Sequence, residues 1–281
     1  MMEVNTMYLN VKETAEKWKI SERSVRNYCS HGKIPGAIID GKSWKIPNNA
    51  VKPVRKKRNA MIPRDLLTRL TIEKKSGISG GIYHKIQIDL TYNSNHIEGS
   101  RLSHDQTRYI FETNTINIQN ETVNVDDIVE TANHFKCIDL IIDLANYPLS
   151  ESLIKQLHLI LKSGTSDSRK SWFAVGDYKR IENEVGGMPT TKPENVCKEL
   201  KALLKSYNNI KQKSLKEIIE FHYEFEKIHP FQDGNGRVGR LIMFKECLRN
   251  GITPFIIEDD LKEFYYLSLI HISEPTRPRL I

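Results

Sequence analysis

The sequence has no long hydrophobic run. A membrane-spanning helix needs about eighteen or more consecutive apolar residues, and no such stretch occurs among the 281. Residues 1–10 are polar and lack the basic start and apolar centre of a secretory leader. Cysteine is scarce: Cys29, Cys137, Cys197 and Cys247 stand too far apart for a metal-binding pair or a dense disulfide framework. We therefore expect no membrane segment, a reducing cytoplasmic setting, and thiols that are buried spectators.

Positive charge is concentrated in one part of the chain. Over the whole sequence 39% of the residues are apolar and 27% charged, which is enough for a sizeable core in one or two domains. Residues 1–60 hold 13 Lys and Arg against 5 Asp and Glu, so this stretch carries +8 and the other residues sum to −1. The asymmetry indicates an electrostatic partner for the N-terminal part, most simply nucleic acid. A basic surface kept for solubility has the same composition.

The N-terminal part has the pattern of two short helices and a hairpin. One helix is predicted over residues 11–18 and a second over 22–30, each preceded by a capping side chain, Asn10 or Ser21. Asp40-Gly41 lies between two short β-prone runs and predicts a tight hairpin. The second helix turns polar donors outward, where they can meet phosphates or base edges.

Residues 1–50 resemble the small winged helix-turn-helix domains of the excisionase and MerR-like type. The likeness runs from Tyr8-Leu9-Asn10 through Lys33-Ile34-Pro35-Gly36 to Trp44-Lys45-Ile46-Pro47. It implies a DNA partner, with the second helix in the major groove and the wing on the backbone. The residues expected to contact DNA are Arg23, Ser24, Arg26, Asn27, Lys33 and Lys42. A module of this shape retained for protein docking is the alternative.

A basic, proline-containing stretch at residues 51–60 is predicted to be a linker. Beyond it the apolar spacing is mainly helical, so a mainly α domain is expected. The predicted helical stretches are 65–75, 83–97, 104–114, 125–145, 151–162, 194–207 and 214–227. We divide this region into a helical N-terminal part, 61–125, and a catalytic core, 126–266.

One run, His229-Pro-Phe-Gln-Asp-Gly-Asn-Gly-Arg-Val-Gly-Arg240, concentrates chemistry where a loop enters a helix. The free N–H groups of a starting helix bind anions, and glycines let the backbone approach a phosphate closely. Arg237 and Arg240 lie three apart and can contact successive phosphates of a nucleotide. Asp233 suits Mg²⁺ held partly by phosphate and water, and His229 suits a general base.

The same run matches the signature of the Fic family, H-P-F-x-D-G-N-G-R-x-x-R, at every specified position. The resemblance extends over much of residues 85–266 and implies ATP-dependent transfer of AMP to a Ser, Thr or Tyr hydroxyl of a protein, this chain included. By position it implies these roles: His229 as general base, Asp233 as Mg²⁺ ligand, Gly234, Asn235 and Gly236 as phosphate cradle, Arg237 as α/β-phosphate clamp, and Arg240 as γ-phosphate contact.

Two further segments carry the resemblance. Residues 181–188 resemble the family's flap, a β-hairpin that pairs with the target's backbone, and the expected docking residues are Ile181, Gly186, Gly187 and Met188. The preceding Gly176-Asp177-Tyr178-Lys179 also fits, although the family more often has arginine at the position of Lys179. An ordinary surface hairpin is the alternative for the flap.

Residues 94–99 resemble the family's inhibitory pattern, in which Ser or Thr precedes Glu by four positions and Gly or Asn follows. Gly99 is a helix-stop signal, so Glu98 places negative charge at the negative end of a helix dipole and needs a cation. We expect Arg240 to be that cation. The Glu98–Arg240 pair, with Ser94 at the start of the pattern, then occupies the γ-phosphate contact, whereas the alternative is a solvated surface glutamate.

Residues 267–281 differ in character from the rest. Leu267 to Arg277 resembles the in-frame translation of a transposase-type sequencing adapter, so we expect the natural sequence to differ after about residue 266. Phe264, Tyr265 and Tyr266 resemble the family segment that lines the adenine pocket.

The sequence thus predicts an autoinhibited AMP transferase with a DNA-binding domain, using ATP and Mg²⁺ on an unidentified protein substrate. Three alternatives stay open: removal of AMP by the same site, phosphate transfer by that site, and a transcription regulator whose Fic-like domain only senses nucleotide. The target, the DNA site and whether the chain forms a homo-oligomer are not identified.

Overall fold

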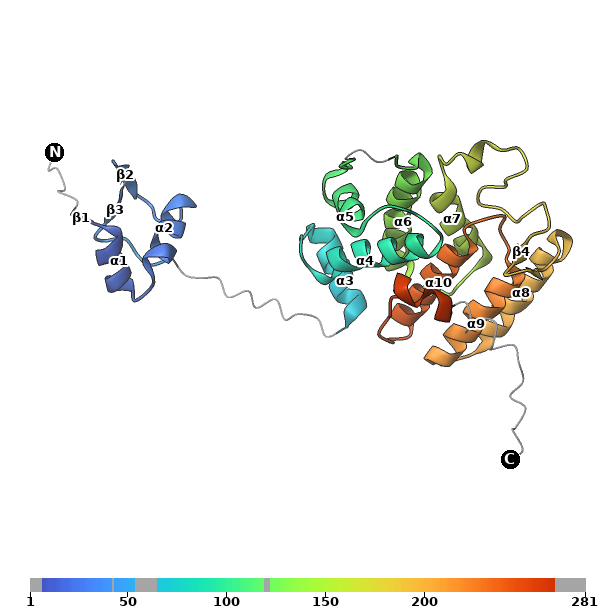
Figure 1. Ribbon diagram of the computed structural model, residues 1–281. Helices are drawn as coiled ribbons and strands as arrows, with labels where there is room; N and C mark the ends of the chain where they lie inside the picture. Colours follow the sequence, from blue (N-terminus) through green and yellow to red (C-terminus); the bar gives the residue numbers. More distant parts are fainter. Residues whose placement is uncertain (1–6, 42, 54–64, 119–121, 266–281) are drawn as a thin grey trace, which may run out of the picture. The chain divides into compact units, whose positions relative to one another are not determined.

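The computed structural model describes residues 7–41, 43–53, 65–118 and 122–265. They belong to two compact units, Met1–Met61 and Ile62–Ile281 (Figure 1). Four predictions concern residues outside these ranges: the wing contact of Lys42, most of the linker 51–60, the adenine-pocket role of Tyr266, and the adapter-like tail 267–281. Among the described residues, no helix is both long enough and apolar enough to cross a lipid bilayer.

The N-terminal unit consists of two short helices and a small sheet. Helix α1 is Val11–Trp18 and α2 is Glu22–Ser30. The oxygen of Asn10 accepts from the Glu13 N–H at 2.9 Å, and Ser21 caps α2 through the Ser24 N–H at 3.3 Å. Both predicted helices and both caps are confirmed.

The sheet of this unit has the order β1-β3-β2, all antiparallel. Its strands are β1 (Tyr8–Leu9), β2 (Ile38–Asp40) and β3 (Ser43–Pro47). The hairpin of β2 and β3 is the predicted one, whereas β1 is an addition that the sequence analysis missed. Two residues are too few for the alternation of apolar and polar side chains to show a strand. The unit's core consists of Val11, Ala15, Trp18, Val25, Cys29, Ile34 and Ile46.

The larger unit is mainly helical, as predicted, with one two-stranded hairpin. Its elements are α3 (Leu66–Ser76), α4 (Ile82–Ile97), α5 (His104–Thr113), α6 (Val125–Leu144), α7 (Glu151–Lys162), η1 (Asp167–Arg169), β4 (Glu184–Val185), β5 (Met188–Pro189), α8 (Pro193–Asn209), α9 (Leu215–Ile228), α10 (Asn235–Arg249) and η2 (Asp259–Leu261). Every predicted helical stretch of this unit corresponds to one of the helices, with ends that differ by at most two residues.

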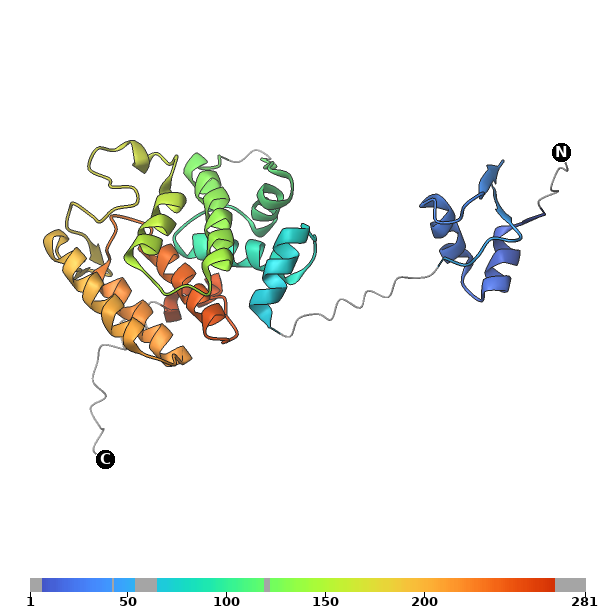
Figure 2. The same ribbon diagram turned by 180° about the vertical axis from the view of Figure 1, so that it is seen from behind.

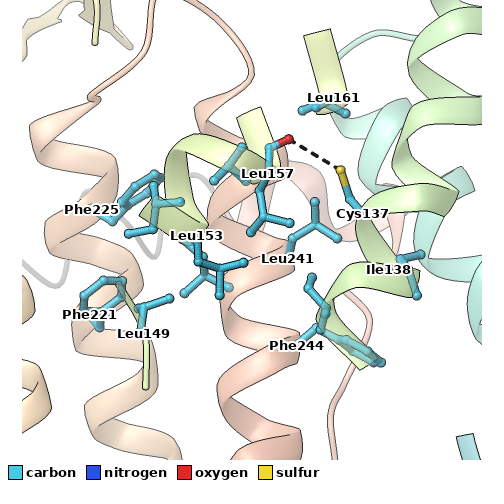
Figure 3. Close-up of a cluster of buried hydrophobic side chains, with 14 of the residues drawn as sticks. Cys137, Ile138, Leu149, Leu153, Leu157, Leu161, Phe221, Phe225, Leu241 and Phe244 are labelled. Atoms are coloured by element: carbon cyan, nitrogen blue, oxygen red, sulfur yellow. Dashed lines mark hydrogen bonds between the residues drawn. The ribbon is translucent and has the colours of Figure 1, made fainter. Parts of the chain in front are cut away.

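Helix α10 lies at the centre of the larger unit, in contact with α3, α4, α6, α7 and α9 (Figures 1 and 2). Every residue from Val238 to Leu248 is buried. Figure 3 shows Leu241 and Phe244 of this helix packed among side chains of α6, α7 and α9. Each such side chain contributes about 1.5–3 kcal/mol by burial, so the core fixes where the N-terminus of α10 lies.

The four cysteines are free thiols. Cys29, Cys137 and Cys247 are buried, and the Cys137 Sγ donates to the Leu157 carbonyl at 3.5 Å (Figure 3). Cys197 is only half-buried, so the prediction of four buried thiols is wrong for this one. Helix α8 packs through Val196, Leu200 and Leu204, and Cys197 stands beside that apolar face.

Candidate active site

The run predicted to carry the chemistry joins the end of α9 to the start of α10. His229 is the C-cap of α9 and has a left-handed backbone, with φ of 49°. Gly234 is the N-cap of α10 with φ of 80°, a conformation that side chains rarely adopt. The loop thus ends at a helix N-terminus, where unpaired N–H groups and the helix dipole favour an anion.

His229 is held as a neutral base. Its Nδ1 lies 3.2 Å from the carbonyl oxygen of Glu226, and because a carbonyl only accepts, the proton belongs on Nδ1 and the lone pair on Nε2. Burial lowers the pKa of His229 to about 4, with a further contribution from the charge of Lys179. At neutral pH the imidazole therefore carries no charge and can accept a proton.

The carboxyl group of Glu226 lies near the Nδ1 side of this imidazole. The Glu226 Oε2 is 3.6 Å from the His229 Nδ1, and the Glu226 side chain is only 11% exposed. Burial, and then the nearby charge of Glu98, raise the pKa of Glu226 to about 8. Sequence reasoning missed this residue, because a glutamate three positions before the base on a helix has the pattern of an ordinary surface residue.

Phe231 and Asn235 hold the loop in shape. Phe231 is fully buried, and its ring stacks on the His158 imidazole with centroids 4.0 Å apart. The Asn235 side chain accepts from the Phe231 N–H and donates to the Phe231 carbonyl, both at 2.8 Å. The Asn235 amide is thus engaged inside the loop. Its role toward phosphate stays a prediction, as do those of Gly234 and Gly236.

His158 of α7 fastens the loop from the other side. Its Nδ1 accepts from the Gly176 N–H at 2.9 Å, so its Nε2 carries the proton and donates to the Asp233 carbonyl at 3.1 Å. Burial lowers the pKa of His158 to about 3, which keeps the ring neutral. The side chains of His158 and His229 therefore hold the two ends of the loop through hydrogen bonds to its backbone and its neighbours.

A buried charge network supports Asp233. Lys162, whose side chain is 3% exposed, donates to Asp233 Oδ2 at 2.6 Å, to Asp167 at 3.0 Å and to Glu130 at 2.5 Å. Arg237 pairs with Glu130 and lies 3.2 Å from Asp233 Oδ2. Burial alone would raise the pKa of Asp233, but Arg237 and Lys162 outweigh it and hold the pKa well below its usual range.

Arg240, the second arginine of the run, contacts the segment 94–99 that is predicted to be inhibitory. Helix α4 ends at Ile97, and Glu98 is its C-cap, followed by Gly99 with φ of 96°. Arg240 donates to the Glu98 Oε1 at 2.7 Å, and to the Ser94 Oγ and carbonyl at 3.0 and 2.9 Å. The structure therefore brings Ser94, Glu98 and Arg240 together.

The carboxylate of Glu98 also covers the start of α10. A Cβ placed on Gly236 would collide with the Glu98 Oε1, so this carboxylate lies against the first turn of the helix. Burial would raise the pKa of Glu98, but the charges of Arg240 and Arg237 lower it. Among the described residues, an internal carboxylate therefore stands where the helix N-terminus favours an anion.

The predicted flap is a β-hairpin. Strands β4 and β5 pair antiparallel, Glu184 with Pro189 and Val185 with Met188, around the left-handed Gly186 and Gly187. Ile181 and Met188 are 49% and 68% exposed. Each strand has a free edge only two residues long, so the hairpin offers a short strip of backbone for pairing.

The donors predicted to contact DNA lie in the N-terminal unit. Arg23, Arg26, Asn27 and Lys33 are exposed, whereas Ser24 is half-buried. Arg26 forms an exposed ion pair with Glu22 at 2.7 Å, and the Ser24 Oγ lies 3.0 Å from the Ser21 Oγ. Arg23, Asn27 and Lys33 are thus the members of the set that are most open to a partner.

The comparisons with known proteins agree with the signature. Residues 148–247 match the model of the Fic/DOC family. The protein adenylyltransferase Fic of Drosophila grimshawi is 30% identical over 183 residues, which are 62% of this chain and 36% of that relative. The protein adenylyltransferase fic-1 of Caenorhabditis elegans is 28% identical over 187 residues, 63% of this chain and 35% of the relative.

Solved structures show the same fold for the larger unit. A Fic domain containing signaling protein from Bacteroides thetaiotaomicron superimposes with a TM-score of 0.61 at 25% identity, over 74% of this chain and 81% of that one. Fic-1 from C. elegans gives 0.53 at 21% identity over 73% of this chain and 63% of that one, which is evidence for the fold alone. The chain spans about a third of the length of the curated relatives it matches.

Proposed function

We propose that this protein transfers AMP from ATP to a hydroxyl group of a protein. The observation that carries the proposal is the pairing of two features in one loop: a neutral imidazole with a free Nε2 at its start, and an anion-binding helix N-terminus with Arg237 and Arg240 at its end. The match of residues 148–247 and the names of the curated relatives support the same chemistry.

The reaction needs one general base and a set of groups that bind the phosphates. His229 takes the proton of the target hydroxyl on Nε2 while its Nδ1 stays bonded to the Glu226 carbonyl. The hydroxyl oxygen bonds to the α-phosphorus, and the bond from that phosphorus to the bridging oxygen breaks, so that pyrophosphate leaves. Arg237 and the backbone N–H groups of the loop stabilise the charge that builds up on the phosphate oxygens.

Asp233 is the residue that fits a magnesium ion. The described residues contain no group of three or more His, Cys, Asp or Glu side chains suited to a metal. Mg²⁺ bound with phosphates needs only one or two protein carboxylates, and the Asp233 side chain is 47% exposed beside the start of α10. Asp233 would hold the ion, which neutralises charge on the triphosphate when bound.

We further propose that Glu98 inhibits this activity. Its carboxylate pairs with Arg240 and lies against Gly236, so it competes with a γ-phosphate for the same guanidinium and the same helix end. ATP then lacks its full set of contacts in the productive orientation. Exchanging Glu98 for glycine removes the competitor and leaves Arg240 in place through Ser94.

ATP labelled in separate positions tests the reaction. The full-length Glu98→Gly protein is incubated with host lysate, Mg²⁺ and ATP carrying label on either the α- or the γ-phosphate. Protein labelled only from the α-position supports AMP transfer, while label only from the γ-position overturns it in favour of phosphate transfer. Glu98→Gly/His229→Ala is the matched control, and only label that this variant fails to add counts as transfer by the site.

The N-terminal unit supports a second proposal, binding to duplex DNA. Its exposed Arg23, Asn27 and Lys33, its net positive charge and its helix-turn-helix with a hairpin are the features that favour it. If the larger unit only senses nucleotide, DNA affinity changes with ATP and the Glu98→Gly protein transfers no AMP. Measuring both activities on one preparation separates the two proposals.

A further inference from the structure

Lys179 is a buried cation whose ammonium group donates hydrogen bonds to neutral groups. It is 3% exposed, and no carboxylate of the described residues lies within ion-pair distance of its ammonium group. Instead Nζ donates to Asn183 Oδ1 and Thr190 Oγ1, both at 2.6 Å, and to the Ile228 carbonyl at 3.3 Å. An ammonium has three donors, and each has an acceptor here. Burying such a charge is costly, so a position that keeps it points to a role.

The three acceptors join two parts of the candidate site. Asn183 and Thr190 flank the β4–β5 hairpin, and they bond to each other as the Thr190 N–H and Oγ1 donate to the Asn183 carbonyl. Ile228 is the last residue of α9, directly before His229. One side chain thus links both ends of the flap to the residue that precedes the base.

Further hydrogen bonds tighten the same junction. The Lys179 N–H donates to the Pro230 carbonyl at 2.8 Å, so this residue binds the backbone on both sides of His229. The Asn183 amide donates to the Phe231 carbonyl at 3.0 Å, and the Ile181 N–H donates to Gln232 Oε1 at 3.2 Å. These hydrogen bonds therefore hold the base of the flap against the loop of His229.

We propose that Lys179 is a positioning residue, which fixes the flap against the loop of His229 so that a hydroxyl docked on the hairpin reaches Nε2. The proposal rests on the proposed function, because it concerns the acceptor side of that reaction. A displacement of about 1 Å between reacting groups can cost about a hundredfold in rate. Lys179 contacts neither the base nor the nucleotide site through its side chain, so it acts through the Ile228 carbonyl and the flap.

The charge of Lys179 provides a separate readout. Burial lowers its pKa to about 8, partly offset by Glu182 and Glu199, so it is charged at pH 7. That charge is one of the causes that lower the pKa of His229, while Glu98 and Asp233 act in the opposite direction. Removing the charge raises the pKa of His229, and arginine, which stays charged, leaves it low.

The experiment compares Lys179→Met and Lys179→Arg in the full-length Glu98→Gly protein, with Lys198→Met, an exposed lysine of α8, as the matched control. We expect Lys179→Met to lower the rate at which lysate proteins are labelled from α-labelled ATP about tenfold to a hundredfold, while the Kd of ATP changes less than about twofold. Lys179→Arg should restore most of the rate. Loss of ATP affinity equal to the loss of rate would overturn the proposal.

Two measurements on the nucleotide-free protein keep the result independent of the proposed function. Amide hydrogen exchange should accelerate over residues 183–190 in Lys179→Met and stay unchanged in the control. An NMR titration of the His229 ring should show a higher pKa in Lys179→Met and not in Lys179→Arg. If Glu98→Gly transfers no AMP, the proposed function fails, whereas unchanged exchange and an unchanged His229 titration refute the role of Lys179.

Discussion

Replacing Glu98 by glycine removes the carboxylate that lies between Arg240 and the start of α10. The pair is 2.7 Å long, with 4% of the arginine side chain and 26% of the glutamate side chain exposed. A hydrogen bond between charged groups contributes about 1.5–3 kcal/mol. Since this bond must break before a γ-phosphate can take its place, its loss should raise the rate of AMP transfer by about tenfold to 150-fold.

The assay is the rate at which the full-length protein labels itself with α-labelled ATP and Mg²⁺. Glu98→Gln, which keeps the shape and removes the charge, should release much of the same activity. Glu224→Gln is the matched control and should leave the rate unchanged, because Glu224 is a glutamate of α9 that pairs with Lys227 and has a 46% exposed side chain. A folded Glu98→Gly protein that labels at the rate of the parent refutes the inhibitory role of Glu98.

Three other changes test separate parts of the molecule. His229→Ala in the Glu98→Gly background should lower AMP transfer by about 10²- to 10⁴-fold with little change in ATP affinity, and retained transfer would remove the imidazole from the mechanism. Lys162→Met should lower the free energy of unfolding in urea by about 3–5 kcal/mol, because it removes the buried ammonium group that Glu130, Asp167 and Asp233 share; a loss below about 1 kcal/mol would contradict the network. Binding to duplex DNA is measured by fluorescence anisotropy at several salt concentrations. A plot of log affinity against log salt concentration should have a slope of about −4, and in Arg23→Ala the slope should be about one unit less steep. An affinity that does not depend on salt would exclude phosphate contacts.

Much of the fold is readable in the sequence because its signals are local. The caps Asn10 and Ser21 and the apolar spacing of the larger unit predict the helices that the structure contains. The helix stop at Gly99 also places Glu98 correctly at the end of α4. The strand Tyr8–Leu9 was missed, because its only support is pairing with residues far along the chain.

The site is readable only in part, for the same reason. The contiguous run from His229 to Arg240 identifies the loop and its likeness to a family, but the groups that hold it come from elsewhere in the chain. Glu130 and Lys162 reach the loop from α6 and α7, and no spacing in the sequence relates them. Lys179 was noticed only as a departure from arginine, although its three hydrogen bonds connect the flap to the base.

Because α10 lies at the centre of the larger unit, residues on this helix tolerate fewer substitutions than residues of the exposed hairpin. The guanidinium of Arg240 stands on a helix whose residues 238–248 are all buried, so substitutions there also loosen the packing of the larger unit. The glycine-tipped hairpin of residues 184–189 has exposed side chains and few packing duties. If the protein transfers AMP as proposed, changes in the hairpin can alter the choice of acceptor protein at little cost in stability, while the choice of nucleotide is tied to the buried core.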